Sequence, residues 1–474
     1  MRRERTRRRL FVVLMSFLLI MLAGCSLGSG QGNTPAPTIT PMTLTPDATG
    51  SATATPVSDT DWTTYHLNNA RTGYVASAPD PSTLTRAWNV KLDGAVYAEP
   101  LVIGNRVIVV TEGDSFYALD KSTGQVQWRT NVGTPVPHSS LPCGNIFPLG
   151  ITGTPVYDPA TGLVFAVAEV QPSSPAHILV GVDLTTGKVR VRRSADLADM
   201  DARAYQQRAA LALSHNMIYI AYGGLAGDCS DYIGTVVASR TDGTGSLLSF
   251  RVPTPREGGI WAPPGPTVDS TGNLYVSVGN GEVTSGQWDK SDSILRLSPT
   301  LQYEDGFAPT QWQQDNSTDA DLGSMGPVLL PDGLIYADGK SGQAYLLHAN
   351  ALGGVGGQIQ EKTICAAYGG AAVIDSQVFV PCTDGIRQII VSSGPSMNVG
   401  WHTQSQISGS PIIGGHTVYS VDYVGGTLYA VDVSNGNVRA TLSIGPTSRF
   451  ATPTLAGNLV FVGTMSGVVA ATIS

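Results

Sequence analysis

Three features of the 474-residue sequence predict an all-β fold. Only 14% of the residues are charged, and 55 Gly and 30 Pro supply many turns, a composition that disfavours long helices. Short β-branched runs alternate with Gly, Asn and Asp, as in strands joined by tight turns. One such run recurs eight times, at intervals of about 40 to 60 residues. We therefore predict an eight-bladed β-propeller of four-stranded antiparallel blades.

Residues 1–24 have the parts of a signal peptide. Six arginines precede an almost wholly apolar run from Leu10 to Leu22, which is shorter than the about 20 residues of a membrane span. The next segment, Leu22-Ala23-Gly24-Cys25, resembles a bacterial lipobox. We expect cleavage before Cys25 and a diacylglycerol on its sulfur. The alternative is an uncleaved anchor helix, and export by the general secretory or the twin-arginine route stays open.

Residues 25–60 are expected to form a disordered tether. From Asn33 to Val57 the chain has five Pro, eight Thr and a single charged residue, Asp47. Such a segment buries too little apolar area to offset the entropy of ordering it. We expect a lipid-anchored protein on the outer face of the cell membrane, with residues 61–474 as its folded domain.

The eight copies of the apolar run are expected to be the inner strands of the blades. The last copy is followed by only two further strands before Ser474, so its blade lacks a fourth strand. Residues 86–92 precede the first copy and have the pattern of an isolated fourth strand. We expect this N-terminal strand to complete the last blade and close the ring, since an open edge favours aggregation. The copies lie at residues 98–102, 153–157, 208–212, 265–268, 326–329, 370–373, 409–413 and 451–455.

A motif in the first repeat resembles the repeat of the PQQ-like, or quinoprotein, propellers. It runs Ala118-x-Asp120-x-x-Thr123-Gly124-x-x-x-Trp128, and weaker copies lie at residues 181–187 and 430–436. The opening segment, residues 61–74, is also similar to the start of this family. The Asp-Thr-Gly run suits a tight turn, and the Trp is expected to dock on the neighbouring blade, where its N–H needs an acceptor.

The resemblance implies two different functions. Some members are PQQ-dependent dehydrogenases of alcohols or sugars with a bound calcium ion, and others are lipoprotein scaffolds in outer-membrane-protein assembly. We expect a membrane-anchored lipoprotein whose propeller is a binding or scaffold module for a protein, glycan or small-molecule ligand. The alternatives are a PQQ-dependent dehydrogenase, a degenerate PQQ-binding protein, or a hydrolase or lyase. The net charge of −8 indicates no nucleic-acid partner.

The dehydrogenase alternative implies candidate residues in the fourth repeat. By resemblance, Asn280 in the Gly-Asn-Gly turn would be a calcium ligand, and Asp289 or Asp292 would be the general base. The adjacent Cys pair of the alcohol dehydrogenases and the haem motif CxxCH are both missing from the sequence. We therefore interpret Asn280 as a turn residue, and Asp289 and Asp292 as solvated loop carboxylates.

An acidic segment follows this repeat. Asp315, Asp319 and Asp321 lack the spacing and the terminal Glu of an EF-hand. We expect them to lie in a surface loop.

With Cys25 assigned to lipid, four cysteines remain, and three pairings into two disulfides are open. Cys365 is expected to open one strand and Cys382 to close the next, so a hairpin would join them. Cys143 lies between the first two repeats and Cys229 in a loop of the third, and propeller topology places such loops on one face. We predict the pairs Cys143–Cys229 and Cys365–Cys382.

Overall fold

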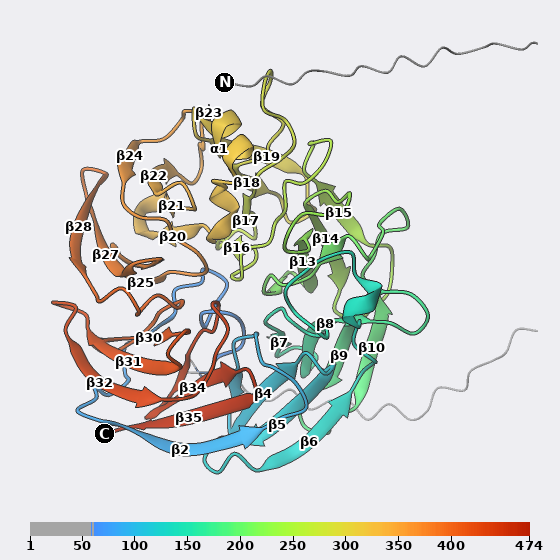
Figure 1. Cartoon of the computed structure of the whole chain (residues 1–474), viewed down its shortest axis with the longest axis vertical. Coiled ribbons are helices and arrows are strands. Elements are labelled where there is room, and N and C mark those ends of the chain that lie inside the picture. The colour runs from blue at the N-terminus through green and yellow to red at the C-terminus, as the bar shows by residue number, and fades with distance from the viewer. Residues whose placement is uncertain (1–57, 59–60) are drawn as a thin grey trace, which may run out of the picture. The chain divides into compact units, whose positions relative to one another are not determined.

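The computed structural model describes Ser58 and residues 61–474. The predicted signal peptide, Cys25 and nearly all of the predicted tether lie outside the described residues. In the described part, eight antiparallel sheets surround a central axis, as Figure 1 shows. The prediction of an eight-bladed β-propeller is confirmed.

Each blade is a meander of four strands, and its first strand lies nearest the axis (Figure 1). Blade 1 contains β3 (Leu101–Ile103), β4 (Arg106–Thr111), β5 (Ser115–Asp120) and β6 (Val126–Asn131), and blade 2 contains β7 (Val156–Asp158), β8 (Leu163–Val170), β9 (Ala176–Asp183) and β10 (Val189–Ser194). Blade 3 contains β12 (Ala212–Ser214), β13 (Met217–Gly224), β14 (Thr235–Arg240) and β15 (Leu248–Arg251), and blade 4 contains β16 (Thr267–Val268), β17 (Leu274–Val278), β18 (Ser293–Leu297) and β19 (Tyr303–Ala308). Blade 5 contains β20 (Val328–Leu330), β21 (Leu334–Ala337), β22 (Gln343–His348) and β24 (Gln360–Thr363), and blade 6 contains β25 (Ala372–Ile374), β26 (Gln377–Cys382), β27 (Gly385–Ser392) and β28 (Ser396–His402). Blade 7 contains β29 (Ile412–Gly414), β30 (Thr417–Asp422), β31 (Thr427–Asp432) and β32 (Val438–Ser443), and blade 8 contains β33 (Thr454–Ala456), β34 (Leu459–Thr464), β35 (Gly467–Ile473) and β2 (Leu84–Lys91).

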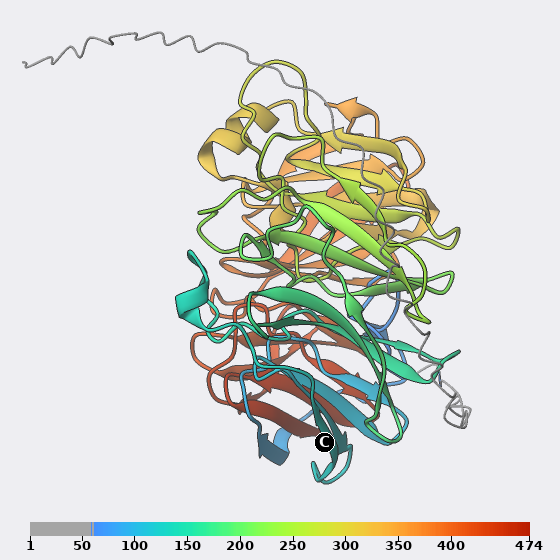
Figure 2. The ribbon, with the colours of Figure 1, turned by 90° about the vertical axis from the view of Figure 1, so that its right-hand side faces the viewer.

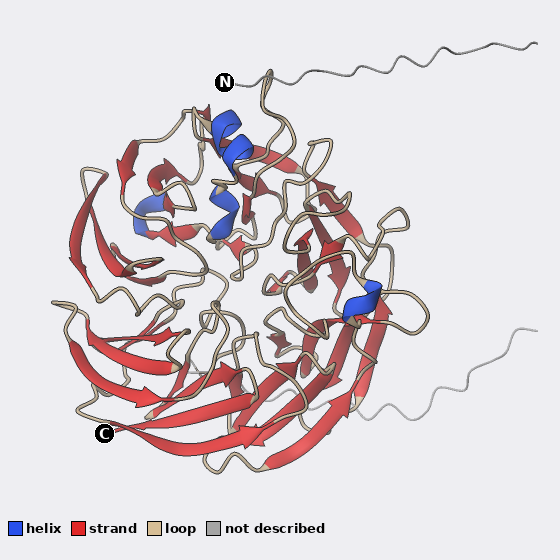
Figure 3. Ribbon diagram, in the orientation of Figure 1, coloured by secondary structure: helices blue, strands red, loops and turns tan. Residues whose placement is uncertain are grey.

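A few short elements decorate the blades, and Figure 3 shows the helices among them in blue. Three two-residue strands extend existing sheets: β1 (Tyr74–Val75) beside β29, β11 (Tyr205–Gln206) beside β13, and β23 (Gly354–Val355) beside β19. The helical segments are α1 (Trp312–Thr318), η1 (His138–Ser140), η2 (Leu322–Ser324) and η3 (Pro331–Gly333).

Blade 8 closes the ring with strands from both ends of the described chain. Strand β2 pairs antiparallel with β35 from Leu84↔Ile473 to Lys91↔Gly467. Beyond this ladder, the backbone N–H groups of Ser82 and Thr83 each donate to the Ser474 carbonyl at 2.7 Å. The predicted closing strand is confirmed. Because β2 and β35 pair with each other, the edge of β35 that β2 covers is not left open.

Apolar side chains fill the spaces between neighbouring blades. One cluster of buried residues runs without interruption from blade 7 through the closing blade 8 to blades 1 and 2. It includes Tyr419 from β30, Phe461 from β34, Val109 from β4 and Val164 from β8, all at most 1% exposed. The join between the two chain ends is therefore packed like any other blade interface.

Three tryptophans on outer strands dock on the next blade. Trp88, Trp128 and Trp401 donate their indole N–H to the carbonyls of Lys121, Leu184 and Val433, at 3.1, 3.0 and 2.7 Å. Each ring lies against the Gly that ends the neighbouring Asp-containing turn. At Gly187, for example, φ is +71° and a Cβ atom would lie 2.8 Å from the Trp128 ring. The predicted role of the Trp is confirmed at Trp128 and recurs at two further interfaces.

Residues 61–75 cross one end of the axis and contact the inner strands of most blades. The Trp62 and Val102 backbones pair, and Tyr157 N–H donates to the Thr63 carbonyl. Further along, Val268 N–H donates to Asn69, Val373 N–H to Thr72 and Ile413 N–H to Gly73. Figure 2 shows this blue segment on the side of the ring opposite η1 and α1. We call residues 61–75 the axial plug.

Candidate functional site

A cavity of about 350 Å³ lies at the end of the axis opposite the axial plug. It is lined by loops that join successive blades and by loops that join the second and third strands of a blade. These loops come from nearly the whole ring, which places the cavity on the axis. We call it the central pocket; it is lined by Asn145, Arg208, Gly224–Asp228, Tyr232, Gly259, Trp261, Asn280, Asp319, Asp321, Lys340, Tyr368, Arg449 and Phe450.

Cations stacked on aromatic rings dominate one side of the central pocket. The Arg208 guanidinium lies 4.7 Å from the centre of the Phe450 ring and 5.7 Å from that of Trp261. The Arg449 guanidinium lies 4.0 Å from the Tyr368 ring centre. Such contacts contribute about 0.5–2 kcal/mol each and leave the N–H donors at the edge of the guanidinium free.

Neither arginine has a polar partner in the described part of the chain. Arg208 and Arg449 make no hydrogen bond and no ion pair there. Ring contacts hold both guanidinium groups, and the buried Glu112 and Glu169 carboxyls also attract the charge of Arg208. Burial lowers the pKa of Arg208 to about 10, so the side chain stays charged at neutral pH. Both residues are half-buried, and both line the central pocket.

The third cation of the central pocket is already neutralised. Lys340 Nζ lies 2.6 Å from the carboxylates of both Asp319 and Asp321. Burial raises the pKa of Asp321 to about 6, and the lysine opposes this shift. Asp228 lies on another wall, where its carboxylate accepts a 2.6 Å hydrogen bond from Tyr232 Oη.

The acidic segment is not the surface loop that was expected. Asp315 and Asp321 are only 6% and 1% exposed, and only Asp319 faces solvent. Helix α1 begins at Trp312, whose indole is buried, and it turns Asp315 inward with it. The expectation was wrong because Lys340 arrives from blade 5, far along the chain, and compensates the buried charge of Asp321.

The first disulfide joins two loops that form one wall of the central pocket. Cys143 and Cys229 are bonded, as predicted. Cys229 directly follows Asp228, and Asn145 lies two residues after Cys143. Beneath them, Val136, Ile146, Leu149 and Leu225 form a small apolar cluster. The disulfide and this cluster together hold the wall in place.

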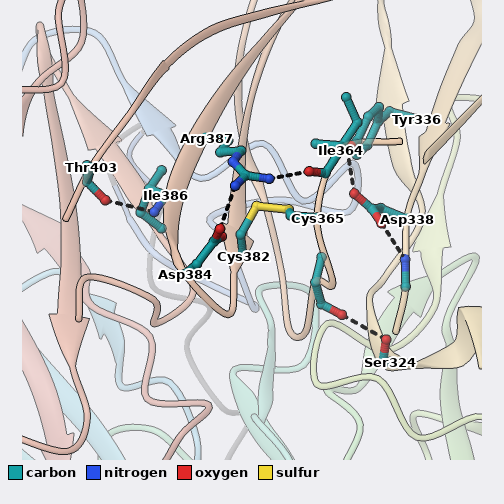
Figure 4. Close-up of a disulfide and its surroundings, with 12 residues drawn as sticks. Ser324, Tyr336, Asp338, Ile364, Cys365, Cys382, Asp384, Ile386, Arg387 and Thr403 are labelled. Atoms are coloured by element: carbon teal, nitrogen blue, oxygen red, sulfur yellow. Dashed lines mark hydrogen bonds and ion pairs between the residues drawn. A yellow bond between two sulfur atoms is a disulfide. The ribbon is translucent and has the colours of Figure 1, made fainter. Parts of the chain in front are cut away.

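The second disulfide, Cys365–Cys382, holds the segment that supplies Tyr368 (Figure 4). The predicted pairing is confirmed, but Cys365 does not open a strand: it lies in the loop between β24 and β25. Arg387 donates to the Ile364 carbonyl and contacts Asp384 at 2.5 Å, and both interactions flank the disulfide in Figure 4. Tyr368 is thus presented to the central pocket by a segment fixed at its base.

The structure separates the candidate metal and base residues. Asn280 lines the central pocket, and its side-chain N–H donates to Glu257 Oε2 at 3.3 Å. Asp289 is not among the lining residues and accepts from Ser291 Oγ at 2.6 Å. Asp292 is not solvated as interpreted: it is fully buried and accepts from the Leu322 N–H at 2.7 Å. Burial, with Asp321 nearby, raises its pKa well above the ordinary value.

Of the two cofactors that the family resemblance implies, the central pocket suits PQQ better than calcium. The ring of Trp261 and the guanidinium groups of Arg208 and Arg449 suit a flat carboxylated molecule such as PQQ. Calcium prefers six to eight oxygen ligands. Within residues 61–474 no three Asp, Glu, His or Cys side chains are placed to share an ion, so the donor set does not fit calcium.

The sequence interpretation did not single out Arg208, Lys340 or Arg449. One signal was available: Arg208 is the first residue of the third apolar run, and Arg449 lies two residues before the eighth. A charged residue at the entrance of an inner strand points toward the axis of the ring.

The described part also has no helix long and apolar enough to cross a membrane.

Comparison with known proteins found one family model that matches part of the chain. The model of a family described as "Outer membrane protein assembly factor BamB" matches residues 70–221. No curated protein matches the chain.

Several solved structures share the fold. A europium-containing methanol dehydrogenase has 14% identity over 88% of this chain and 98% of its own, with a TM-score of 0.68. A quinohemoprotein alcohol dehydrogenase from Comamonas testosteroni has 16% identity over 90% and 81%, with a TM-score of 0.63. BamB from Moraxella catarrhalis has 13% identity over 82% and 100%, with a TM-score of 0.55.

At these identities the structural likeness shows the fold alone, since one fold carries unrelated functions. The family match, the repeat motif and the eight-bladed ring agree with one another. The chain is an eight-bladed β-propeller, and its residues 70–221 match the model of one PQQ-like family.

Proposed function

We propose that the chain is an extracytoplasmic lipoprotein, anchored to the outer face of the cell membrane through Cys25, whose propeller is a binding module with the central pocket as its binding site. The observation that carries the proposal is the pair of unpartnered arginines in a cavity at the open end of the axis. The axial plug fills the other end.

The rigidity of the pocket walls supports a binding role. Two disulfides hold loops that line the pocket. Walls fixed before a ligand arrives lower the entropic cost of binding. A cavity of about 350 Å³ is also near the lower end of the about 300–1,000 Å³ found for small-molecule sites.

The anchoring half of the proposal rests on the Leu22-Ala23-Gly24-Cys25 segment. Its test is the full chain expressed in a bacterial host with radiolabelled palmitate. Label and membrane association are expected for the natural chain, and Cys25→Ser is expected to lose the label. Equal labelling of both chains would contradict lipidation at this position.

The binding half is tested by native mass spectrometry of the folded protein purified from its host. A bound small molecule is expected on the natural chain and not on Arg208→Met. Arg203→Met is the matched control, because Arg203 lies in the same between-blade loop but is exposed and paired with Asp201 at 2.7 Å. An identical spectrum for all three proteins would contradict the proposal.

One observation favours a second candidate, the PQQ-dependent dehydrogenase. Trp261 and Asn280 line the same pocket. Reconstitution with PQQ and calcium, followed by dye-linked oxidation of alcohols and sugars, tests this candidate. Activity that is abolished in Asn280→Ala would replace the binding module with the enzyme.

A further inference from the structure

We propose that a cavity between blades 5 and 6 binds a small, flat aromatic molecule that carries one N–H donor. This cavity shares no lining residue with the central pocket, so the site is independent of the proposed function. At most blade interfaces one particular turn is covered by a side chain of the preceding blade. Between blades 5 and 6 that turn faces a cavity.

The turn joins the third and fourth strands of a blade, and we call it the outer turn. One residue at its start donates its backbone N–H to the turn between the first two strands, and its carbonyl accepts a donor from the preceding blade. In blades 1, 2 and 7 these residues are Lys121, Leu184 and Val433, and the donors are the indoles of Trp88, Trp128 and Trp401.

Blade 5 uses a different donor at the same place. The Ala349 N–H donates to the Gly333 carbonyl, which marks Ala349 as the equivalent residue. Its carbonyl accepts from Tyr275 Oη at 3.2 Å and from Arg296 Nη1 at 3.1 Å, both from blade 4. A tryptophan is therefore not required, but this outer turn is still covered from the preceding blade.

In blade 6 the equivalent residue is Val391, whose N–H donates to the Ser376 carbonyl at 2.8 Å. Within residues 61–474 no side chain donates to the Val391 carbonyl. The preceding strand, β24, begins with Gln360, and Gln360 pairs with Leu346. This is the register in which Trp128 pairs with Ala118 in blade 1. Blade 5 thus has a glutamine at the position of the docking tryptophan.

Gln360 does not take over the role of an indole. Its side-chain oxygen accepts the Met397 N–H at 2.6 Å, which ties β24 to the outer strand of blade 6. Lys362 Nζ donates to the carbonyl of the same methionine at 2.9 Å. These contacts hold the two outer strands together and leave the outer turn of blade 6 uncovered.

Two other outer turns lack a side-chain donor to this carbonyl but are covered in other ways. In blade 3, Val191 of blade 2 lies on the turn, where a Cβ atom on Gly243 would come within 2.7 Å of it. Arg193 also donates to the Gly243 carbonyl at 3.2 Å. In blade 8, the equivalent residue Ile473 pairs with Leu84 of the closing strand. The open turn of blade 6 is an exception among the described blades.

A cavity of about 210 Å³ lies against this open turn. Leu330 and Val391 are buried and form an apolar floor together with the half-buried Leu334. His348 and Ser393 lie at an exposed polar rim. We call this space the blade 5–6 cavity. An apolar floor with a polar rim suits a ligand that has an apolar ring and a polar edge.

The space beside the turn suits one flat ring system. A Cβ atom on Gly394 would meet nothing within 4 Å, whereas one on Gly187 would lie 2.8 Å from the Trp128 ring. An apolar cavity of about 150 Å³ holds benzene, so the blade 5–6 cavity accommodates a larger ring such as indole. The Val391 carbonyl is the acceptor for its N–H, as the equivalent carbonyls are for the tryptophans.

A small molecule fits the cavity better than a segment of this chain. Residues 26–60 precede the axial plug, and they contain no aromatic side chain that would take the place of an indole.

The test is isothermal titration of the folded full chain with indole. Indene, which has the same shape but no N–H, is the control for the hydrogen bond. Indole is expected to bind, and indene to bind about fivefold more weakly because one neutral hydrogen bond is missing. Hydrogen exchange of residues 391–396 should slow with indole, whereas residues 225–234 at the central pocket should not change.

Gln360→Trp supplies the missing indole from the chain itself. It is expected to weaken indole binding at least tenfold and to raise the melting temperature. Glu361→Trp is the matched control, because Glu361 is exposed and successive side chains of a strand point to opposite faces. If Gln360→Trp does not fold, Ser393→Phe decides the question, since it places a ring at the exposed rim.

Several results would overturn the proposal. These are no indole binding, equal affinity for indene, unchanged affinity in both Gln360→Trp and Ser393→Phe, or an equal loss in Glu361→Trp. A dimer that Ser393→Phe dissociates would show that a second copy of the chain covers the cavity, which would also overturn it. Arg208→Met should leave indole binding unchanged, so this proposal and the proposed function fail separately.

Discussion

The two ends of the propeller axis hold arginines in opposite circumstances. At the plugged end, Arg71 is 3% exposed and donates four hydrogen bonds, to Thr64 Oγ1 and to the carbonyls of Tyr65, Leu211 and Pro266. At the open end, Arg208 and Arg449 have aromatic contacts alone. Arg71 is a buried cation whose acceptors come from several parts of the chain, so it belongs to the architecture. Arg208 and Arg449 are half-buried and lack such acceptors, which is why we propose them as ligand-binding residues.

The plugged end is a polar hub as well as a seal. Glu99 accepts from the His66 backbone N–H at 2.9 Å, and burial raises its pKa well above the ordinary value. His66 is fully buried, and burial lowers the pKa of its ring to about 3, so the ring is neutral. Arg71 is the cation of this hub, and its removal affects all of its hydrogen-bond partners at once.

The largest effect is expected from Arg71→Met, which tests whether the plugged end is structural. It removes the Arg71 donor from three buried carbonyls, of which only that of Leu211 keeps another donor, the Thr64 hydroxyl. The free energy of unfolding should therefore fall by about 3–5 kcal/mol. Urea denaturation followed by tryptophan fluorescence measures the change, with Arg203→Met as the exposed control. A loss as small as that of Arg203→Met would mean that the plug does not stabilise the ring.

The next effect concerns how the open end is held. Replacing both Cys143 and Cys229 by Ala removes a cross-link between residues 86 positions apart, and we expect a loss of about 2–4 kcal/mol. The pocket wall should also loosen, which hydrogen exchange of residues 225–234 would detect as faster exchange. Unchanged exchange there would show that the apolar cluster beneath the disulfide is sufficient.

A gradual, pH-dependent effect is expected behind the open end, at Glu112. Burial raises the pKa of this carboxyl from its ordinary 4.5 to about 8, although Gly150 N–H and Thr152 Oγ1 donate to it. The folded state then holds a proton that the unfolded state releases above about pH 4.5. This group's stabilising contribution is complete below that pH and is lost as the pH rises to about 8, with a slope of at most about 1.4 kcal/mol per pH unit.

Melting temperatures of the natural chain and of Glu112→Gln between pH 5 and 8 measure this contribution. The natural chain should lose more stability over that range than the variant. Parallel curves would mean that Glu112 is ionised throughout in the folded state.

The smallest effect is expected at the outer end of the loop that carries Arg208. Asp201→Asn breaks the exposed ion pair with Arg203, and exposed pairs contribute little, so the change should stay below about 0.5 kcal/mol. Chemical denaturation measures it. A larger change would show that this loop is set by its charges and not by its packing.

Much of the fold was predictable because it depends on local pattern. All eight predicted inner strands overlap first strands of blades, and residues 86–92 fall almost entirely within β2. The period-2 alternation and the turn residues specify a strand without reference to distant parts of the chain. Both disulfide pairings followed from the order of strands and loops in a propeller.

The candidate site was less predictable. Asn280 was a candidate from the sequence and lines the central pocket, whereas the other candidate, Asp289, does not. The sequence analysis did not identify the charged side chains of the central pocket. Repeats reveal what is common to the blades, whereas a site at the axis is made from what differs between them. Arg208 and Arg449 differ from their counterparts in the other repeats, and a repeat pattern averages such differences away.

The sequence by itself determined the repeated blade, the closing strand, the docking of Trp128 and the pairing of the cysteines, because each depends on neighbouring residues and on the order of the repeats. Only the tertiary structure decided that Arg71 is bonded by several blades while Arg208 and Arg449 are not, and that Lys340 compensates Asp321. These residues meet through closure of the ring. The environment of a charge is a property of all the loops around it, and no single segment of the chain contains them.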